Sequence, residues 1–226
     1  MKTVGILGGM GPEATILLMQ KLLAAVPARD DSDHIPLIVH QNPQVPSRIK
    51  ALIEGTGEDP GPTLARMARD LYAAGAEALA MPCNTAHHYA PIVTAATPLP
   101  FLNMLNLTAA SLAAQGARRV GMLASPATRL TRVFDAPFAV HGLTPVFLSD
   151  DSGLLALIRA VKAGEAASTL KPRLTLEAQA LLGQGADHLL VACTELSLMT
   201  DALPDTAPHS DSLDCLTLAI AEFASR

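Results

Sequence analysis

Short apolar runs alternate with longer amphipathic segments along the first half of this chain. Residues 3–8 and 36–40 are largely apolar and β-branched, as buried parallel strands are. A helical pattern follows each run: residues 13–26 come after the first, and residues 63–74 carry apolar side chains every three to four positions after the second. Alternating strands and helices predict a parallel sheet with right-handed crossover connections.

The second half of the chain repeats the order of the first. Residues 119–125 resemble residues 3–9 at a shift of 116, and residues 183–197 resemble residues 73–87 at a shift of 110. Each copy of the second repeat consists of a helix end, a short apolar strand and a cysteine. The sequence therefore predicts an α/β fold of two pseudo-symmetric half-domains, each with a mainly parallel sheet flanked by helices.

The remaining elements complete the two halves. Expected are a strand at 101–104, a helix at 106–116, a strand at 146–148, a helix from 152 that carries Lys162, and a helix that ends at Gly183. A last helix over 212–223 is expected to pack back on the first half. The predicted domains are therefore residues 1–103 plus 212–226, and residues 104–211.

Composition narrows the classes of protein that fit. Half of the 226 residues are hydrophobic, which is enough to bury a substantial core. A net charge of -5 without a cluster of Lys and Arg argues against a nucleic-acid partner. No apolar run reaches the length of a membrane-spanning helix, and the N-terminus lacks a signal peptide's apolar region. Three cysteines, an odd count, favour free thiols in a reducing cytoplasm over a disulfide framework.

A glycine-rich turn follows the first strand and matches the loose dinucleotide pattern Gly9-x-Gly11-x-x-Ala14. The dinucleotide fold also needs an acidic residue at the end of the second strand to hold the ribose, and residues 40–42 are His-Gln-Asn instead. We therefore expect this turn to bind a small carboxylate rather than NAD, with backbone N–H groups facing the anion at the helix N-terminus.

The irregular loop 42–48 lies at the carboxyl end of the second strand, where open α/β sheets bind their ligands. It contains Gln44 and ends at Arg48. A guanidinium group there binds a carboxylate through two parallel hydrogen bonds, or else it is a solvated surface charge. The polar stretch 54–61 is expected to form a surface loop or a lid.

Cys83 and Cys193 allow several interpretations. A buried cysteine is most often an inert core thiol, and we adopt that reading for Cys215 in the last helix. Zinc would need additional ligands, for which His87 and His88 are the nearest candidates, but the second half offers no matching pair, so no metal is expected. A redox disulfide lacks the Cys-x-x-Cys arrangement, and a Cys–His pair leaves the second cysteine unexplained.

One chemistry explains both the repeat and the pair of cysteines. Inversion of a stereocentre through a carbanion needs a base on one face and an acid on the other, and two matched thiols across a cleft meet that demand. Each cysteine precedes a predicted helix N-terminus, whose dipole is expected to lower the thiol pKa. The polar residues that follow the cysteines are placed to hold a substrate's ammonium and carboxylate: Asn84, Thr85, Thr194 and Glu195.

These segments resemble the aspartate/glutamate racemase superfamily, the cofactor-independent amino-acid racemases. The matching segments span almost the whole chain: Gly8-Gly-Met-Gly-Pro12, Asn42-Pro-Gln-Val-Pro-Ser-Arg48, Pro82-Cys-Asn-Thr-Ala-His87, Val161-Lys-Ala-Gly164 and Ala192-Cys-Thr-Glu195. The two cysteine motifs together are specific, whereas the glycine turn is not.

The resemblance implies two similar α/β domains with the active site in the cleft between them, a homodimer, and no cofactor. It implies Cys83 and Cys193 as the acid/base pair. It also implies a set of contacts to a small amino-acid substrate: Met10, Gln44, Arg48, Asn84, Thr85, Lys162, Thr194 and Glu195. Ile49 stands where related loops carry threonine, which favours neutral or more varied amino acids as substrates in addition to aspartate and glutamate.

Other functions fit the same fold. A hydantoin racemase or a maleate isomerase would use a similar site, whereas an arylmalonate decarboxylase needs only one proton donor and is disfavoured by the paired cysteines. A non-catalytic sensor of amino acids or carboxylates would have no need of both thiols.

Overall fold

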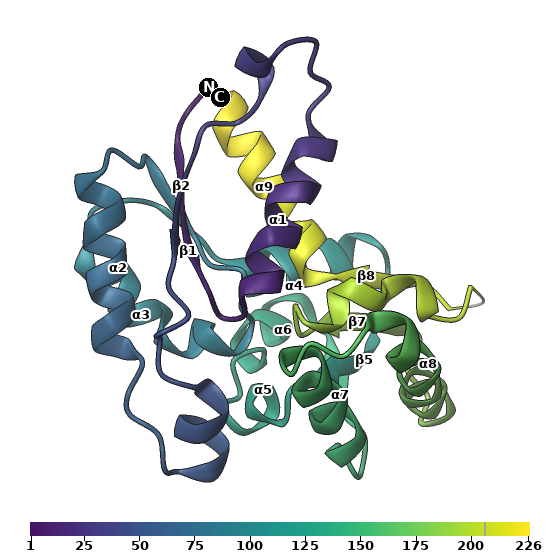
Figure 1. Cartoon of the computed structure of the whole chain (residues 1–226). Coiled ribbons are helices and arrows are strands. Elements are labelled where there is room, and N and C mark those ends of the chain that lie inside the picture. Colours follow the sequence, from purple (N-terminus) through teal and green to yellow (C-terminus); the bar gives the residue numbers. More distant parts are fainter. Residues whose placement is uncertain (206) are drawn as a thin grey trace.

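The computed structural model describes residues 1–205 and 207–226, which form two parallel sheets of the same topology (Figure 1). The first sheet has the order β2 (Leu37–Gln41), β1 (Val4–Gly8), β3 (Ala78–Ala80), β4 (Phe101–Leu102). The second has the order β6 (Thr144–Val146), β5 (Arg119–Ala124), β7 (His188–Ala192), β8 (His209–Asp211). All six strand pairings are parallel. The predicted α/β fold with two similar halves is confirmed.

Helices cover both faces of each sheet. The α-helices are α1 (Pro12–Ala25), α2 (Gly61–Ala73), α3 (Ala90–Ala96), α4 (Met104–Ala114), α5 (Pro126–Leu130), α6 (Asp135–His141), α7 (Ser152–Lys162), α8 (Ala167–Gly183) and α9 (Ser212–Ser225). Shorter turns of helix are η1 (Asp31–Asp33), η2 (Lys50–Glu54), η3 (Thr85–Tyr89) and η4 (Leu196–Ala202). Apolar side chains of α2 and α3 pack on one face of the first sheet, and those of α1 and α9 on the other. The second sheet lies between α7 and α8 on one face and α4 and α6 on the other.

The repeat seen in the sequence is also a repeat of side-chain packing. A Cβ atom built on Gly5 would lie 2.9 Å from the Ala76 Cβ and 3.1 Å from the Leu79 Cδ2. A Cβ atom on Gly121, 116 residues later, would lie 3.0 Å from the equivalent atoms of Ala186 and Leu189. In both halves the glycine leaves space on the central strand. The end of the helix that precedes the cysteine strand can therefore pack closely against it.

The C-terminal helix joins the two halves. After β8 in the second sheet the chain enters α9, which packs against α1 and α4 (Figure 1). The Lys2 backbone N–H donates to the Ala224 carbonyl at 2.9 Å, so the two termini lie side by side. The expected packing of the last helix on the first half is confirmed, whereas the boundaries of the two domains remain a prediction.

Several predicted boundaries were wrong for local reasons, among them the strand expected at 101–104, which as β4 ends at Leu102. Strand β6 covers Thr144–Val146 rather than 146–148, because its register pairs Val146 with Gly121 and its edge position tolerates the missing N–H of Pro145. Helix α4 begins two residues earlier than expected, because the Asn103 side chain caps it by accepting hydrogen bonds from two backbone N–H groups. The expected loop at 54–61 starts only after η2, a single π-helical turn. Among the described residues, no helix has both the length and the apolar character to cross a membrane.

Candidate active site

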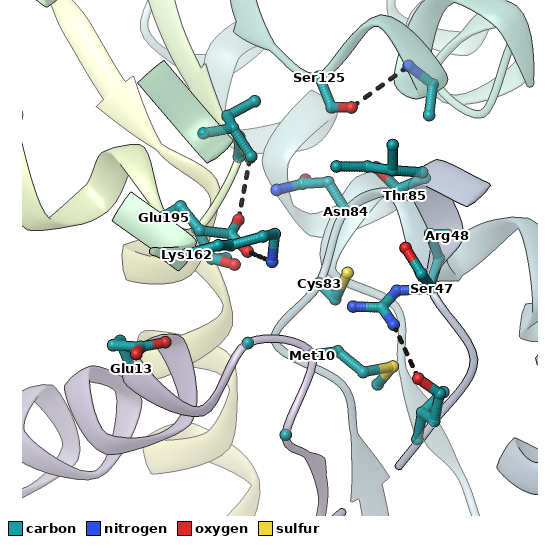
Figure 2. Close-up of a pocket in the computed structure, with 18 of the residues that line it drawn as sticks. Met10, Glu13, Ser47, Arg48, Cys83, Asn84, Thr85, Ser125, Lys162 and Glu195 are labelled. Carbon is teal, nitrogen blue, oxygen red and sulfur yellow. Dashed lines mark hydrogen bonds and ion pairs between the residues drawn. The ribbon is translucent and has the colours of Figure 1, made fainter. Parts of the chain in front are cut away.

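A cavity of about 330 Å³ opens between the two halves at the carboxyl ends of the strands (Figure 2). Its lining comes from the turns that follow β1, β3, β5 and β7, together with the loop after β2 and one face of α7. This is the edge at which parallel α/β sheets bind ligands. Nine predicted site residues line it: Met10, Arg48, Cys83, Asn84, Thr85, Lys162, Cys193, Thr194 and Glu195. Gln44 is exposed and lies outside the lining, so the structure does not place it at the site.

Both cysteines reach the cavity from equivalent positions. Cys83 follows β3 and Cys193 follows β7, and their residues are 8% and 7% exposed. Cys215 lies in α9, only partly buried and outside this lining.

The expectation that a helix dipole lowers the pKa of both thiols is wrong for Cys193. Burial, followed by the adjacent Glu195 carboxylate, raises its pKa well above the ordinary value. The cysteine is followed only by the short turn η4, and desolvation together with a neighbouring negative charge outweighs any dipole there. Cys193 is therefore a thiol in the unliganded protein.

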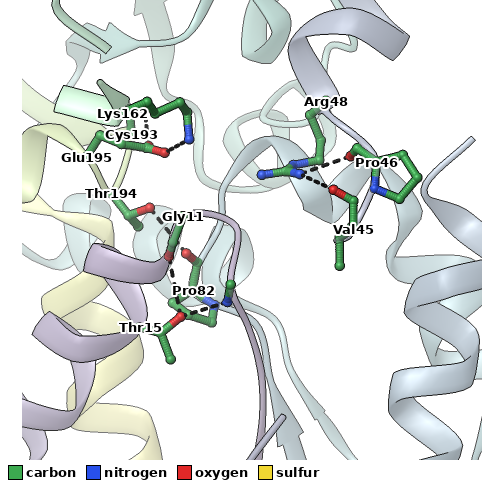
Figure 3. Close-up of polar contacts among 11 residues, drawn as sticks. Gly11, Thr15, Val45, Pro46, Arg48, Pro82, Lys162, Cys193, Thr194 and Glu195 are labelled. Carbon is green, nitrogen blue, oxygen red and sulfur yellow. Dashed lines mark hydrogen bonds and ion pairs between the residues drawn. The ribbon is translucent and has the colours of Figure 1, made fainter. Parts of the chain in front are cut away.

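Glu195 holds Cys193 and Lys162 in one polar array (Figure 3). The Cys193 thiol donates to Glu195 Oε2 at 3.0 Å, and the Lys162 ammonium forms an ion pair with Oε1. Burial opposes both charges, but each stabilises the other, which lowers the pKa of Glu195 and raises that of Lys162. Thr85 occupies the position equivalent to Glu195 in the first half, so the two cysteine turns differ in charge.

Arg48 places a cation on the opposite wall of the cavity, on the side of Cys83 and Met10 (Figure 2). Its Nη1 donates to the Pro46 carbonyl at 3.0 Å, which fixes the direction of the guanidinium group. Its Nε is buried and has no hydrogen-bond partner in the described part of the chain. The positive charge of the guanidinium group attracts an anion to this wall of the cavity.

Asn84 and Thr85 line the cavity immediately after Cys83. The Asn84 Nδ2 donates to the Ser212 hydroxyl at 2.8 Å, while its buried Oδ1 has no partner among the residues described. The Thr85 hydroxyl lies 3.4 Å from that of Thr128. Asn84 thus links the first cysteine turn to Ser212, and Thr85 brings a hydroxyl group to the cavity wall.

His87 is a structural histidine. Its Nδ1 lies 2.9 Å from the Cys83 carbonyl and its Nε2 accepts the Met104 backbone N–H at 3.1 Å. Burial lowers its pKa to about 4, so the ring is neutral near pH 7. No group of metal-ligating side chains occurs within residues 1–205 and 207–226.

The turn after β1 depends on a glycine. Gly9 has a φ of +91°, and a Cβ atom there would lie 2.4 Å from the Asn42 backbone carbon. The close approach brings Met10 and the loop 42–48 to the same cavity wall.

Further lining residues come from segments that were expected at the site. They are Gly9, Gly11, Pro12 and Glu13 of the glycine-rich turn, and Pro43, Val45, Ser47 and Ile49 of the loop after β2. The lining residues that were not predicted are Ser125, Ala127, Ile158 and Ala192. Ser125 was within reach of sequence reasoning, because the shift of 116 lays it on Gly9. No pattern distinguishes Ile158 from the other apolar positions of its helix.

The comparisons with known proteins agree with this geometry. The family model described as Asp/Glu/Hydantoin racemase matches residues 7–221. The chain is 24% identical to the broad specificity amino-acid racemase RacX of Bacillus subtilis over 234 residues, which covers 94% of each protein.

Two solved structures extend the similarity to the fold. Picrophilus torridus aspartate racemase superposes with a TM-score of 0.86 at 29% identity, over 100% of this chain and 95% of that one. PH1733, an aspartate racemase homologue from Pyrococcus horikoshii, gives 0.77 at 23% identity over the full length of both chains. The chain therefore belongs to the Asp/Glu/hydantoin racemase family and is a racemase, an isomerase, of that family.

Proposed function

We propose that this protein racemises amino acids without a cofactor, with Cys83 and Cys193 as the two bases. The observation that carries the proposal is the placement of two thiols from equivalent strand ends in one cavity. Each half of the molecule supplies one of them, which is the arrangement that two-sided proton transfer requires.

The reaction moves one proton at a time. The thiolate on one face takes the α-proton, so a C–H bond breaks and an S–H bond forms. The thiol on the other face then donates its proton to the carbanion, which forms the mirror-image C–H bond and leaves a thiolate. For an enantiomer that uses Cys83 as the base, Cys193 is already protonated and held by Glu195 as the donor.

The substrate's charged groups match the free polar groups of the cavity. Arg48 lines the cavity and binds a carboxylate through its guanidinium group. The Glu195 carboxylate, which also lines the cavity, accepts hydrogen bonds from the ammonium. Thr85 and Thr194 add hydroxyl groups beside the two cysteines. Stabilisation of charge on the carboxylate of the carbanion is the main electrostatic task of such a site.

The cavity favours more than acidic amino acids. Arg48 and Lys162 are the cations of the described lining, and Glu195 already neutralises Lys162. A second substrate carboxylate therefore gains little, while Ile49 and Ile158 offer apolar surface to a side chain. We infer that neutral amino acids are accepted alongside aspartate and glutamate, in keeping with the name of the relative from Bacillus subtilis.

The test is proton exchange in D2O with a panel of L- and D-amino acids, followed by NMR and chiral chromatography, with maleate and a hydantoin in parallel. The wild-type protein should invert at least one amino acid and place deuterium at its α-carbon. Cys83→Ser and Cys193→Ser should each lose about 10²- to 10⁴-fold in racemisation, as expected for an acid/base residue.

Cys215→Ser is the matched control, because it removes the third thiol at a site outside the cavity and should keep wild-type activity. Full activity in both cavity variants would refute the two-cysteine mechanism. Turnover of maleate or the hydantoin alone would assign a different reaction, and tight amino-acid binding without exchange would indicate a sensor. The homodimer implied by the resemblance remains a prediction.

A further inference from the structure

The junction between β8 and α9 is buried beneath the two cysteine turns. Asp211 ends β8 and Ser212 begins α9, and they are 4% and 0% exposed. Here the chain leaves the second sheet and enters the helix that packs on the first half. Neither residue lines the cavity, so neither touches a substrate bound there.

The Ser212 hydroxyl bonds to both cysteine turns. It donates to the Val191 carbonyl at 3.0 Å and accepts from the Asn84 Nδ2 at 2.8 Å. Val191 precedes Cys193 by two positions in β7, and Asn84 directly follows Cys83. A single buried oxygen atom thus joins the strand that carries one thiol to the residue next to the other.

Asp211 continues the same network on the side of Cys193. Its Oδ1 accepts from the Ser197 hydroxyl at 2.9 Å and from the Leu213 backbone N–H at 2.8 Å. Ser197 lies in η4, the turn that follows Cys193, so the carboxyl group ties that turn to the start of α9. Thr194 adds a direct link between the halves, because its hydroxyl donates to the Pro82 carbonyl at 3.2 Å (Figure 3).

We propose that Asp211 and Ser212 are positioning residues that fix the separation of the Cys83 and Cys193 turns, so that the thiol opposite the base reaches the carbanion. This inference rests on the proposed two-cysteine function. A displacement of about 1 Å between reacting groups costs on the order of 100-fold in rate. The two turns follow strands of different sheets and lie far apart in the sequence. Non-covalent contacts such as these therefore have to hold them at a fixed separation.

A change in the positions of the two turns alters the stereochemistry of deuterium exchange, whereas a loss of stability alone does not. If the turns separate, the thiolate that removed the α-proton stays beside the carbanion, while the opposite thiol withdraws. The first thiol exchanges its new proton for a deuteron from D2O and returns that deuteron to the carbanion, so a C–D bond forms with retention of configuration. Deuterium exchange without inversion should therefore rise relative to inversion.

The experiment compares Ser212→Ala with the wild-type enzyme in D2O, on the amino acid that the wild type inverts fastest. Inversion should fall about 10- to 100-fold, and the ratio of exchange with retention to inversion should rise by about tenfold. Thr217→Val is the matched control: its buried hydroxyl lies in the same helix and bonds only to the Leu213 carbonyl at 2.8 Å. Its ratio should stay at the wild-type value.

Thermal unfolding of each variant separates stability from positioning. Ser212→Thr keeps the hydroxyl and should restore the ratio. If Ser212→Ala does not fold, Ser197→Ala removes one bond of the same network and should shift the ratio in the same direction by a smaller factor. If Ser212→Ala folds and shows the same ratio of retention to inversion as Thr217→Val, the inference is overturned. A wild-type protein that inverts no amino acid would instead refute the proposed function.

Discussion

Glu195 makes the two thiols chemically different. Its carboxylate accepts the Cys193 S–H at 3.0 Å, while Cys83 has Thr85 at the equivalent position. Burial and this carboxylate both raise the pKa of Cys193, and Lys162 lowers it. Burial and the carboxylate two positions after the cysteine together keep Cys193 protonated.

Glu195→Gln should lower the pKa of Cys193, because it removes the negative charge and leaves Lys162 without its counter-ion. The alkylation rate of Cys193, measured against pH and located by mass spectrometry, should rise at lower pH than in the wild type. Glu13→Gln changes a second carboxyl group of the lining that bonds to neither thiol, and it should leave the profile in place. An unchanged or upward-shifted profile in Glu195→Gln would contradict this account.

At the scale of the element, the matched glycines test the repeat. An alanine at Gly5 or Gly121 places a Cβ atom within about 3 Å of side chains in the next strand and helix end. Overpacking of this kind typically costs about 1–3 kcal/mol in the free energy of unfolding. We expect losses of similar size in Gly5→Ala and Gly121→Ala, measured by urea denaturation.

Gly183→Ala is the control for both, since it ends α8 with no atom within 4 Å of the added Cβ. Its stability should stay constant or rise slightly, because alanine favours the helix more than glycine does. A cost in only one of the two strand variants would show that the halves do not pack equivalently.

The elements that the sequence predicts well are those with long periodic patterns and a second copy. Strand β5 and helix α7 begin where expected because apolar periodicity and the repeat agree. Strand β6 was misplaced because its limits come from register with β5, a non-local pairing, and its edge position makes Pro145 acceptable. The start of α4 depends on the Asn103 cap. The prediction followed the apolar pattern and did not use this local signal.

In the candidate site, too, some features could be predicted from the sequence and others could not. Residues in the two cysteine motifs could be placed at one cavity because equivalent strand ends meet at one edge. The raised pKa of Cys193 could not, because its main cause is burial, which the motif does not give, even though the Glu195 carboxylate that adds to it lies in the same motif. Gln44 was misplaced because neighbours in an irregular loop point in different directions, and sequence gives no rule for which of them face inward.

At the scale of the whole molecule, two buried groups contribute to the pH dependence of stability with opposite signs. Burial lowers the pKa of His87 from 6.5 to about 4, so the unfolded chain takes up a proton first and stability falls as pH drops through that window. Burial raises the pKa of Asp211 from 3.8 to about 6, so the unfolded chain releases its proton first and stability falls as pH rises. Each effect amounts to about 3 kcal/mol, because one pKa unit is worth about 1.36 kcal/mol.

Between pH 4 and 6 the two contributions should nearly cancel in the wild-type protein. His87→Gln keeps a neutral donor and acceptor and should expose the Asp211 effect, with stability that falls as pH rises. Asp211→Asn should expose the opposite slope. Urea denaturation at a series of pH values measures both, and parallel curves for the two variants would contradict the assignment.

The difference between the two cysteine turns also has a consequence for kinetics. Enantiomers have equal free energies, so the equilibrium constant of racemisation is one, and kcat/KM must be equal for the L- and D-substrates. In the proposed mechanism Cys193 is the proton donor for one enantiomer and the base for the other, and the Glu195 carboxylate beside it is replaced by Thr85 at the equivalent position after Cys83. The asymmetry therefore has to emerge as kcat and KM values that differ between the enantiomers by the same factor: one enantiomer binds more tightly and turns over more slowly.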